Sequence, residues 1–187
     1  MKIEEFIDAY KTIPVTSAAL SPAESKLGKT AREIIEMASC YASDARVFLT
    51  SGDRVNAFAA AAYGLGWINA GEELGYICAE SRLLPKLFEE FPKDLTPKLE
   101  EKTLRYQRML TQALACVHIA PDKETAAYPA AEEILTLAQE HLTAGGARLP
   151  ADYVNALSLF SYGYGWLDCG VRAGLFTISG DRHLFTI

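Results

Sequence analysis

The hydrophobic residues of this chain recur at alternating spacings of four and three, the period of an α-helix with one buried face. Three such seams comprise Ile34, Ala38, Tyr41, Ala45 and Phe48; Ala127, Ala131, Ile134, Ala138 and His141; and Leu99, Thr103, Tyr106, Leu110, Ala113 and Val117. The pair Thr96-Pro97 is typical of the start of the last of these helices. The pattern predicts an all-α protein.

Two further segments are apolar nearly all round and repeat one another. Residues 52–77 align with residues 151–176 at an offset of 99, and ten of the 26 positions are identical. Ordinary residue frequencies would give about two identities by chance, so the alignment indicates an internal duplication. A helix without a polar face is buried on several sides. We therefore expect each of these helices to pack in the interior.

The similarity continues upstream at an offset of 93. There Ala45, Leu49, Thr50 and Gly52 align with Ala138, Leu142, Thr143 and Gly145, which implies about six inserted residues in the second copy. Each copy then contains a long antiparallel helical hairpin, because a glycine ends one helix and an aspartate caps the next. The turns are expected at Gly52 and Asp53 in the first copy and at Gly145 and Asp152 in the second.

The duplication divides the chain into two tandem modules that each resemble a three-helix bundle. The first module is predicted at residues 1–82, a linker with two prolines at 83–95, and the second module with a tail at 96–187. In the tail, apolar and polar residues alternate around Ser179-Gly180-Asp181. This pattern predicts either a small β-hairpin or an ordered coil.

The residues shared by the two copies form a stripe on each repeated helix. On a helical wheel they fall within about 20° of one line: Asn56, Tyr63 and Trp67 in the first copy, and Asn155, Tyr162 and Trp166 in the second. Small residues recur every seven positions beside the stripe, including Gly64, Gly71, Gly163 and Gly170. Interior glycines cost up to about 1 kcal/mol relative to alanine. We therefore expect another backbone to approach closely there.

The stripe has two interpretations. In the first, which we favour, its members are core residues whose polar tips bond to the backbone, as is usual for aromatic residues at helical spacing. In the second, they line a cleft for a planar ligand, which an amide, a phenol and an indole can bind by stacking and hydrogen bonding.

Asp168 and Asp44 are further candidate site residues. Asp168 and Asn69 occupy equivalent places, and Asp168 is expected to form an exposed ion pair with Arg172 one turn away. Asp44 is a candidate site carboxylate, although Leu137 replaces it in the second copy at the offset of 93. His141 replaces Phe48 in the same alignment and is interpreted as a histidine at the edge of the core. The sequence predicts no catalytic residue, metal site or cofactor.

Composition narrows the class of protein. The 187 residues carry a net charge of −6, with a pI of about 5.1, which disfavours nucleic acid as a partner. The start of the chain is acidic and amphipathic, and the longest uncharged stretches are shorter than the roughly 20 residues that a membrane-spanning helix needs. The four cysteines show no paired spacing. We expect a cytoplasmic protein that binds no membrane.

The segments YASDARVFLTSGDRVNAFAAAAYGLGWINAG and DYVNALSLFSYGYGWLDCGVRAGLF resemble an archaeal family named for a domain of unknown function, number 357. The resemblance covers roughly Ser25 to Ile77 and Glu124 to Phe176. It implies small three-helix bundles and an archaeal source, and it supplies no reaction. Two departures stand out: Asn69 replaces the family's aspartate in the first copy, and residues 134–137 of the second copy lack the family's Tyr-x-x-Asp element.

These observations favour a non-enzymatic interaction or scaffold protein built from two pseudo-symmetric modules. A small-molecule-binding protein with an aromatic cleft between the repeated helices is the alternative. An enzyme is the third choice, because no nucleophile stands with a base. A protein partner or self-association is left open.

Overall fold

The described residues fold into six helices, with the longest connection between the third and the fourth. The computed structural model describes residues 1–186, and its elements confirm an all-α fold. The helices are α1 (Ile3–Thr16), α2 (Lys26–Thr50), α3 (Arg54–Glu73), α4 (Thr96–Cys116), α5 (Ala127–Arg148) and α6 (Tyr153–Arg172). Four short strands and two 3₁₀ turns complete them: β1 (Ala18–Ala19), β2 (Ile77–Cys78), β3 (Val117–Ile119), β4 (Phe176–Ile178), η1 (Lys93–Leu95) and η2 (Arg182–Leu184).

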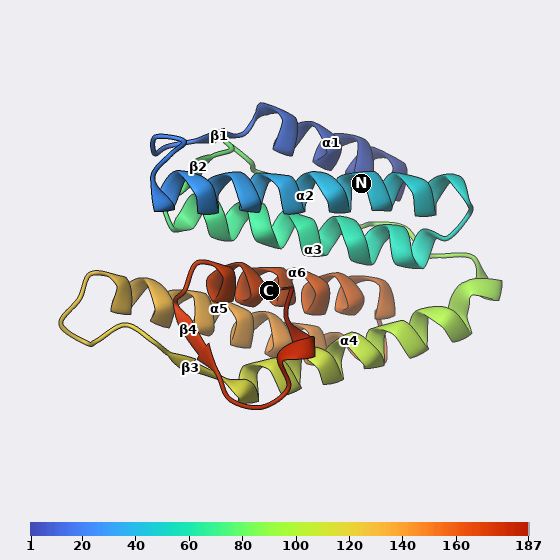
Figure 1. The fold of residues 1–187 in the computed structure, drawn as a ribbon. Coiled ribbons are helices and arrows are strands. Elements are labelled where there is room, and N and C mark those ends of the chain that lie inside the picture. Colours follow the sequence, from blue (N-terminus) through green and yellow to red (C-terminus); the bar gives the residue numbers. More distant parts are fainter. Residues whose placement is uncertain (187) are drawn as a thin grey trace.

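The duplication is visible as two layers of three helices each (Figure 1). Helices α1, α2 and α3 form one layer, α4, α5 and α6 form the other, and α3 faces α6 across the middle. Each layer also carries a two-stranded antiparallel ribbon, β1 with β2 and β3 with β4. Each ribbon ties the end of the first helix of its layer to the chain that follows the third helix.

The predicted tail therefore contains one strand whose partner lies elsewhere. Phe176–Ile178 forms β4 and pairs with Val117–Ile119 at the end of α4. Beyond β4, residues 182–184 form the turn η2. The backbone groups of β4 thus bond to β3, the strand that follows α4, and not to the residues after Ser179-Gly180-Asp181.

Contacts within the modules correct the upstream part of the repeat alignment. A Cβ on Gly71 would contact Ile34, and a Cβ on Gly170 would contact Ile134, so these residues are equivalent at an offset of 100. The predicted offset of 93 is wrong by one heptad. A shift of seven residues returns a helix to almost the same face, so the seam alone could not distinguish the two registers.

Three consequences follow from the corrected register. His141 replaces Tyr41, and Ala144 replaces Asp44. The expected six-residue insertion is absent from the described chain, because α5 continues to Arg148 and α6 begins at Tyr153. Gly145 lies inside α5 instead of ending it, and there it makes room for the ring of Phe160. Asp53 and Asp152 do cap α3 and α6, as predicted, by accepting backbone N–H groups.

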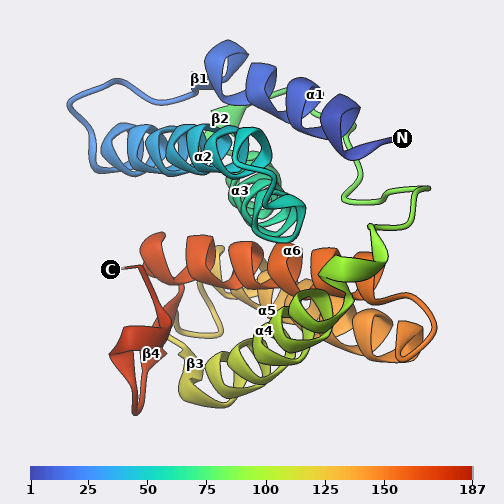
Figure 2. The same cartoon turned by 90° about the vertical axis from the view of Figure 1, so that its right-hand side faces the viewer.

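The two modules meet in a main-chain contact between α3 and α6. A Cβ on Gly66 would overlap the carbonyl oxygen of Tyr162 and lie 3.1 Å from the Cα of Gly165. Gly165 meets the carbonyl of Tyr63 and the Cα of Gly66 in the same way. The two helices cross rather than run side by side (Figure 2), so a single glycine on each helix is sufficient at the crossing point.

The glycines of the predicted stripe do not lie at the contact between the two modules. Gly64, Gly71, Gly163 and Gly170 all face helices or strands of their own module, where a Cβ would overlap mainly side-chain atoms. Gly64 packs against Tyr10 and Tyr41, for example, and Gly163 against His141. These glycines therefore bring the helices of one module together, while Gly66 and Gly165 bring the two modules together.

The predicted linker follows the surface of both modules. Its Leu87 exchanges two hydrogen bonds with the Asn155 side chain, and its Pro85 accepts one from Ser158. Glu89 accepts a hydrogen bond from the backbone of Ile3 at the start of α1. The segment thus connects α6 to α1. None of the helices in the described part of the chain combines the length and the hydropathy required to cross a bilayer.

Candidate functional site

The two asparagines of the predicted stripe stabilise the starts of their own helices. Asn56 donates to the capping carboxylate of Asp53 at 2.6 Å, and Asn155 donates to that of Asp152 at 2.9 Å. In each helix the same aspartate also accepts the backbone N–H of the asparagine, one of the free N–H groups of a helix start. Their partners are therefore structural, and neither asparagine lines a cavity with the stripe's aromatic residues.

The two tryptophans are core residues. Trp67 is fully buried and Trp166 is 6 % exposed. Within residues 1–186 neither indole N–H has a hydrogen-bond partner. Trp67 lines the outer cavity described below and Trp166 lines none of the cavities described here, so none of them is walled by both indoles, the alternative considered from sequence.

The tyrosines of the stripe instead form polar contacts between the modules. The Tyr63 hydroxyl on α3 donates to the carboxylate of Asp168 on α6. On the other side of the crossing, the Tyr162 hydroxyl on α6 accepts a hydrogen bond of 2.7 Å from the Asn69 amide on α3. Because Tyr63 is equivalent to Tyr162 and Asn69 to Asp168, the two pairs are related by the internal duplication. They differ in that only one of them contains a carboxylate.

Asp168 is a buried carboxylate, not the exposed ion-pair member expected from sequence. Its side chain belongs to a residue that is 1 % exposed, and Arg172 pairs with Glu33 of α2 instead. Asp168 accepts hydrogen bonds from the Thr186 backbone N–H at 3.2 Å, from the Thr186 hydroxyl at 2.5 Å and from Tyr63. Burial raises the pKa of Asp168 above its usual range, although the hydrogen bonds from Thr186 and Tyr63 oppose that rise.

Asp168 borders a cavity of about 170 Å³ between the two modules. We call it the tyrosine cavity. Its walls come from α2, α3, α4, α6 and the chain after β4, and its lining residues are Tyr41, Tyr63, Tyr106, Met109, Tyr164, Asp168 and residues 183–186. One water molecule occupies about 30 Å³ of liquid, so the cavity has room for a small organic molecule.

The tyrosine rings meet at steep angles around this space. The ring centroids of Tyr41 and Tyr63 are 4.6 Å apart with an angle of 57° between the ring planes, and those of Tyr63 and Tyr164 are 5.8 Å apart with an angle of 80°. Burial raises the pKa of Tyr41 to about 12, and burial with the nearby charge of Asp168 raises the pKa of Tyr63 well above its usual value. The phenols are therefore neutral at physiological pH.

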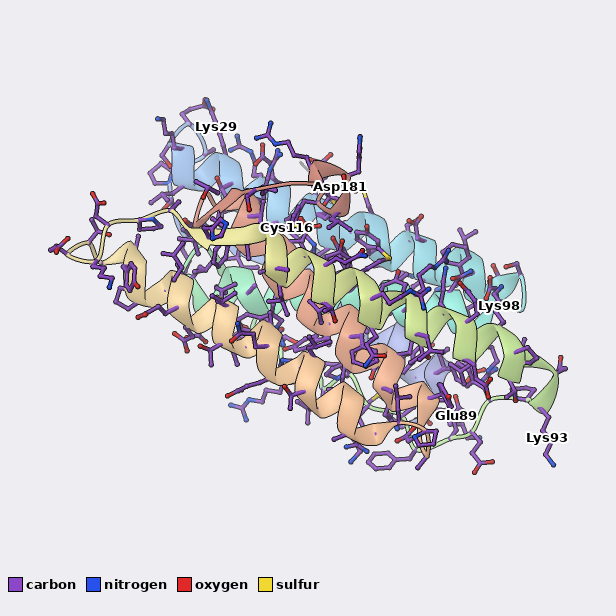
Figure 3. All side chains as sticks on the ribbon, turned by 90° about the horizontal axis from the view of Figure 1, so that it is seen from below. Lys29, Glu89, Lys93, Lys98, Cys116 and Asp181 are labelled. Carbon is purple, nitrogen blue, oxygen red and sulfur yellow. The ribbon has the colours of Figure 1, made fainter. Side chains whose placement is uncertain are left out.

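Residues 183–186, which we call the covering segment, close one side of the cavity. The Tyr164 hydroxyl donates to the carbonyl of Leu184, Phe185 is buried, and Thr186 is bonded to Asp168. Upstream of it, the chain crosses the end of α4, where Ser179 N–H donates to the carbonyl of Cys116 at 2.7 Å. Asp181 and Cys116 mark this crossing in Figure 3.

A second cavity, of about 200 Å³, lies on the other side of Thr186. We call it the outer cavity. It is lined by Glu33, Glu36, Met37, Cys40, Trp67, Arg172 and Thr186. Thr186 therefore belongs to the lining of both cavities.

The pseudo-symmetric position on the other side of the molecule has different chemistry. Tyr162 contacts His141 there, with ring centroids 4.8 Å apart, and Asn69 replaces the carboxylate. The His141 ring bonds to the carbonyl of Leu137, and burial lowers the pKa of His141.

Of the residues singled out from sequence, Tyr63 and Asp168 line the tyrosine cavity. Asp44 is exposed on α2 and lies outside its lining. Tyr106 and Tyr41 were recognised only as seam residues, and Tyr164 and Thr186 were not singled out. The substitution of Leu65 by Tyr164 in the second copy was the available signal. Among residues 1–186, no group of three or more histidine, cysteine, aspartate or glutamate residues is placed to hold a metal ion.

Comparisons with known proteins identify a family and no further relatives. Neither the curated proteins nor the solved structures contain a match. One family model, described as "Protein of unknown function (DUF357)", matches the chain twice, at residues 9–77 and at residues 105–176. The two matches cover most of the chain, and each spans most of one three-helix layer. The protein is therefore a member of the DUF357 family that carries two tandem copies of the family's domain.

Proposed function

We propose that this protein binds a small molecule in the tyrosine cavity between its two modules. The observation that carries the proposal is Asp168, a buried carboxylate that borders an open volume and forms no salt bridge within residues 1–186. Burying a charge costs free energy unless it is paired. Such a residue is more typical of a binding site than of a core that was shaped for stability alone.

The position of the cavity supports the same proposal. Ligand sites occur preferentially at interfaces between domains, as concave and mainly apolar spaces with a few polar groups. The tyrosine cavity combines aromatic walls from both modules with one carboxylate and four phenol hydroxyls. The tyrosine cavity differs from the aromatic cleft considered from sequence, because its lining includes Tyr63 and Asp168 and neither tryptophan.

An interaction or scaffold role has weaker support. The sequence favours that hypothesis through the expected packing of the two modules by their glycine-lined helices, and it names no surface for a partner. In this chain the crossing at Gly66 and Gly165 is already occupied by the other module. The duplication therefore satisfies within one chain the contact that would otherwise need a partner.

A thermal-shift screen against a metabolite library tests the proposal. A ligand at about 100 times its Kd stabilises the native state by about 2.7 kcal/mol, which corresponds to a rise in Tm of roughly 5–10 °C for a chain of this size. We expect at least one compound to give such a shift.

Two tryptophan substitutions on α4 locate the binding. Met109 lines the cavity, so Met109→Trp should fill it and abolish the shift. Arg108 is its exposed neighbour, so Arg108→Trp should leave the shift intact. If no compound stabilises the wild type, or if the two variants respond alike, the tyrosine cavity is not a ligand site.

A further inference from the structure

We infer that the ligand of the tyrosine cavity is an organic ammonium cation, with a methylated ammonium group as the part that enters. This inference rests on the proposed function and specifies its ligand class. It is carried by three features of the cavity: an unpaired carboxylate in the wall, aromatic rings on several sides, and acidic residues at the adjoining outer cavity.

The first feature is the charge of the wall. All three groups that donate hydrogen bonds to Asp168 are neutral: the Tyr63 hydroxyl, the Thr186 hydroxyl and the Thr186 backbone N–H. The nearest arginine on its own helix, Arg172, is held by Glu33 at 2.8 Å. His183 of the covering segment is exposed and is the one basic side chain among the lining residues. A ligand that carries a positive charge would therefore supply the missing counter-charge.

The second feature is the set of aromatic walls. A cation is attracted to the face of an aromatic ring, and sites for quaternary ammonium groups use several rings at once. Tyr41, Tyr63, Tyr106 and Tyr164 surround the cavity from four different helices. Because the planes of Tyr41 and Tyr164 are steeply inclined to that of Tyr63, the rings do not stack on one another. Tyr63 contacts both Tyr41 and Tyr164, and all of these rings belong to the cavity lining.

The lining also argues against other classes of ligand. An anion would meet the Asp168 carboxylate, and the lining residues include no lysine or arginine. A metal ion would need several oxygen or nitrogen ligands in a fixed geometry, whereas the wall offers one carboxylate among phenols. A methylated ammonium group makes few demands for hydrogen bonds, so a mainly aromatic wall with one carboxylate suits it.

The third feature is the route past Thr186. The outer cavity carries Glu33 and Glu36 as well as Arg172, so its lining holds two carboxylates and one guanidinium. The chain as a whole has a net charge of −6. Negative surfaces raise the local concentration of cations and accelerate their association. A cation that displaces the covering segment would replace the hydrogen bonds from Thr186 to Asp168 with ionic attraction to the carboxylate.

Calorimetric titration of the full chain tests the ligand class. The probes are tetramethylammonium, choline and trimethyl-lysine, with 3,3-dimethylbutan-1-ol as the uncharged isostere of choline. We expect at least one ammonium probe to bind and the neutral isostere to bind at least about tenfold more weakly than choline, because cation–π and ionic attraction are lost.

Asp168→Asn removes the charge while keeping the shape. The pair of Tyr162 with Asn69 shows that this scaffold accepts an asparagine at the equivalent place, so the variant is expected to fold. It should lose at least about tenfold in affinity for the ammonium probes. Asp44→Asn, which removes an exposed carboxylate outside the cavity, is the matched control and should retain wild-type affinity.

Tyr106→Leu should also weaken the binding of the ammonium probes, and Tyr128→Leu on α5, outside the cavity lining, should not. The inference is overturned if no ammonium probe binds, if the neutral isostere binds as tightly as choline, or if Asp168→Asn keeps full affinity. A library compound without a positive charge that is excluded by Met109→Trp would overturn the ligand class alone and leave the cavity as a binding site. If no compound of any class binds, the proposed function itself fails.

Discussion

Alanine in place of Gly66 is the sharpest test of how the two modules dock. A Cβ at this position would overlap the carbonyl oxygen of Tyr162 and lie 3.1 Å from the Cα of Gly165. Both neighbours are main-chain atoms of a helix, so neither can rotate away as a side chain would. Relief requires α3 and α6 to separate, and a gap of about 1 Å already forfeits up to about half of the dispersion attraction between surfaces in contact.

Two opposing effects set the magnitude. Alanine is favoured over glycine inside a helix by about 1 kcal/mol, which would stabilise the variant if nothing else changed. Overpacking of a well-packed core costs typically about 1–3 kcal/mol and sometimes more, and here main-chain atoms block the usual relaxation. We expect Gly66→Ala to lower the free energy of unfolding by about 2 kcal/mol net, which is a fall in Tm of roughly 4–8 °C for a chain of this size.

Gly146→Ala provides the matched control. Gly146 is also inside a long helix, α5, but the nearest atom to a Cβ there is the Gln107 side-chain nitrogen at 3.9 Å. Only the helix preference remains, so this variant should gain up to about 1 kcal/mol. Urea unfolding monitored by circular dichroism measures both. If Gly66→Ala is as stable as the wild type, or if both variants change in the same direction, the main-chain contact does not hold the modules together.

Three further substitutions test the buried groups. Burial raises the pKa of Asp168, so the stability that this group contributes is full below about pH 4 and is lost as the pH rises through the raised value. The stability of Asp168→Asn relative to wild type should therefore increase from pH 4 to pH 7. A stability difference that does not depend on pH would contradict this. Burial lowers the pKa of His141, so the wild type should lose stability as the pH falls below about 6.5. His141→Tyr, which restores the residue of the first copy, should reduce that loss of stability. An acid unfolding transition that is unchanged in this variant would show that His141 is not its source. Tyr164→Phe removes the hydroxyl that donates a hydrogen bond to the carbonyl of Leu184. Since one hydrogen bond contributes about 0.5–1.5 kcal/mol, hydrogen exchange at the backbone amide of Thr186 should become about three- to tenfold faster. An exchange rate equal to that of the wild type would mean that other contacts hold the covering segment in place.

The helices and the duplication could be predicted from sequence because they depend on local pattern. The apolar seams, the caps at Asp53 and Asp152 and the matched residues of α3 and α6 all lie within short stretches of chain. The register of α2 against α5 was predicted one heptad out, because helix periodicity is nearly unchanged by a shift of seven residues. Only contacts such as those of Gly71 with Ile34 and Gly170 with Ile134 distinguish the two registers.

The interface and the cavity depend on geometry that local pattern does not encode. A stripe of glycines at every seventh position would suit helices that pack nearly parallel, but α3 and α6 cross, so one contact point at Gly66 and Gly165 replaces the stripe. The crossing also decides which side chains surround Asp168. Tyr41, Tyr106 and Tyr164 reach the cavity from three helices far apart in the sequence, so their convergence could not be inferred from spacing.

A crystal structure of the protein grown with saturating tetramethylammonium tests the central claim most directly. The account predicts the cation in the tyrosine cavity, facing the Asp168 carboxylate and in contact with the tyrosine rings of its lining, with the covering segment displaced or rearranged around it. A tyrosine cavity that stays empty at saturation, or a cation held only elsewhere on the molecule, would contradict the account.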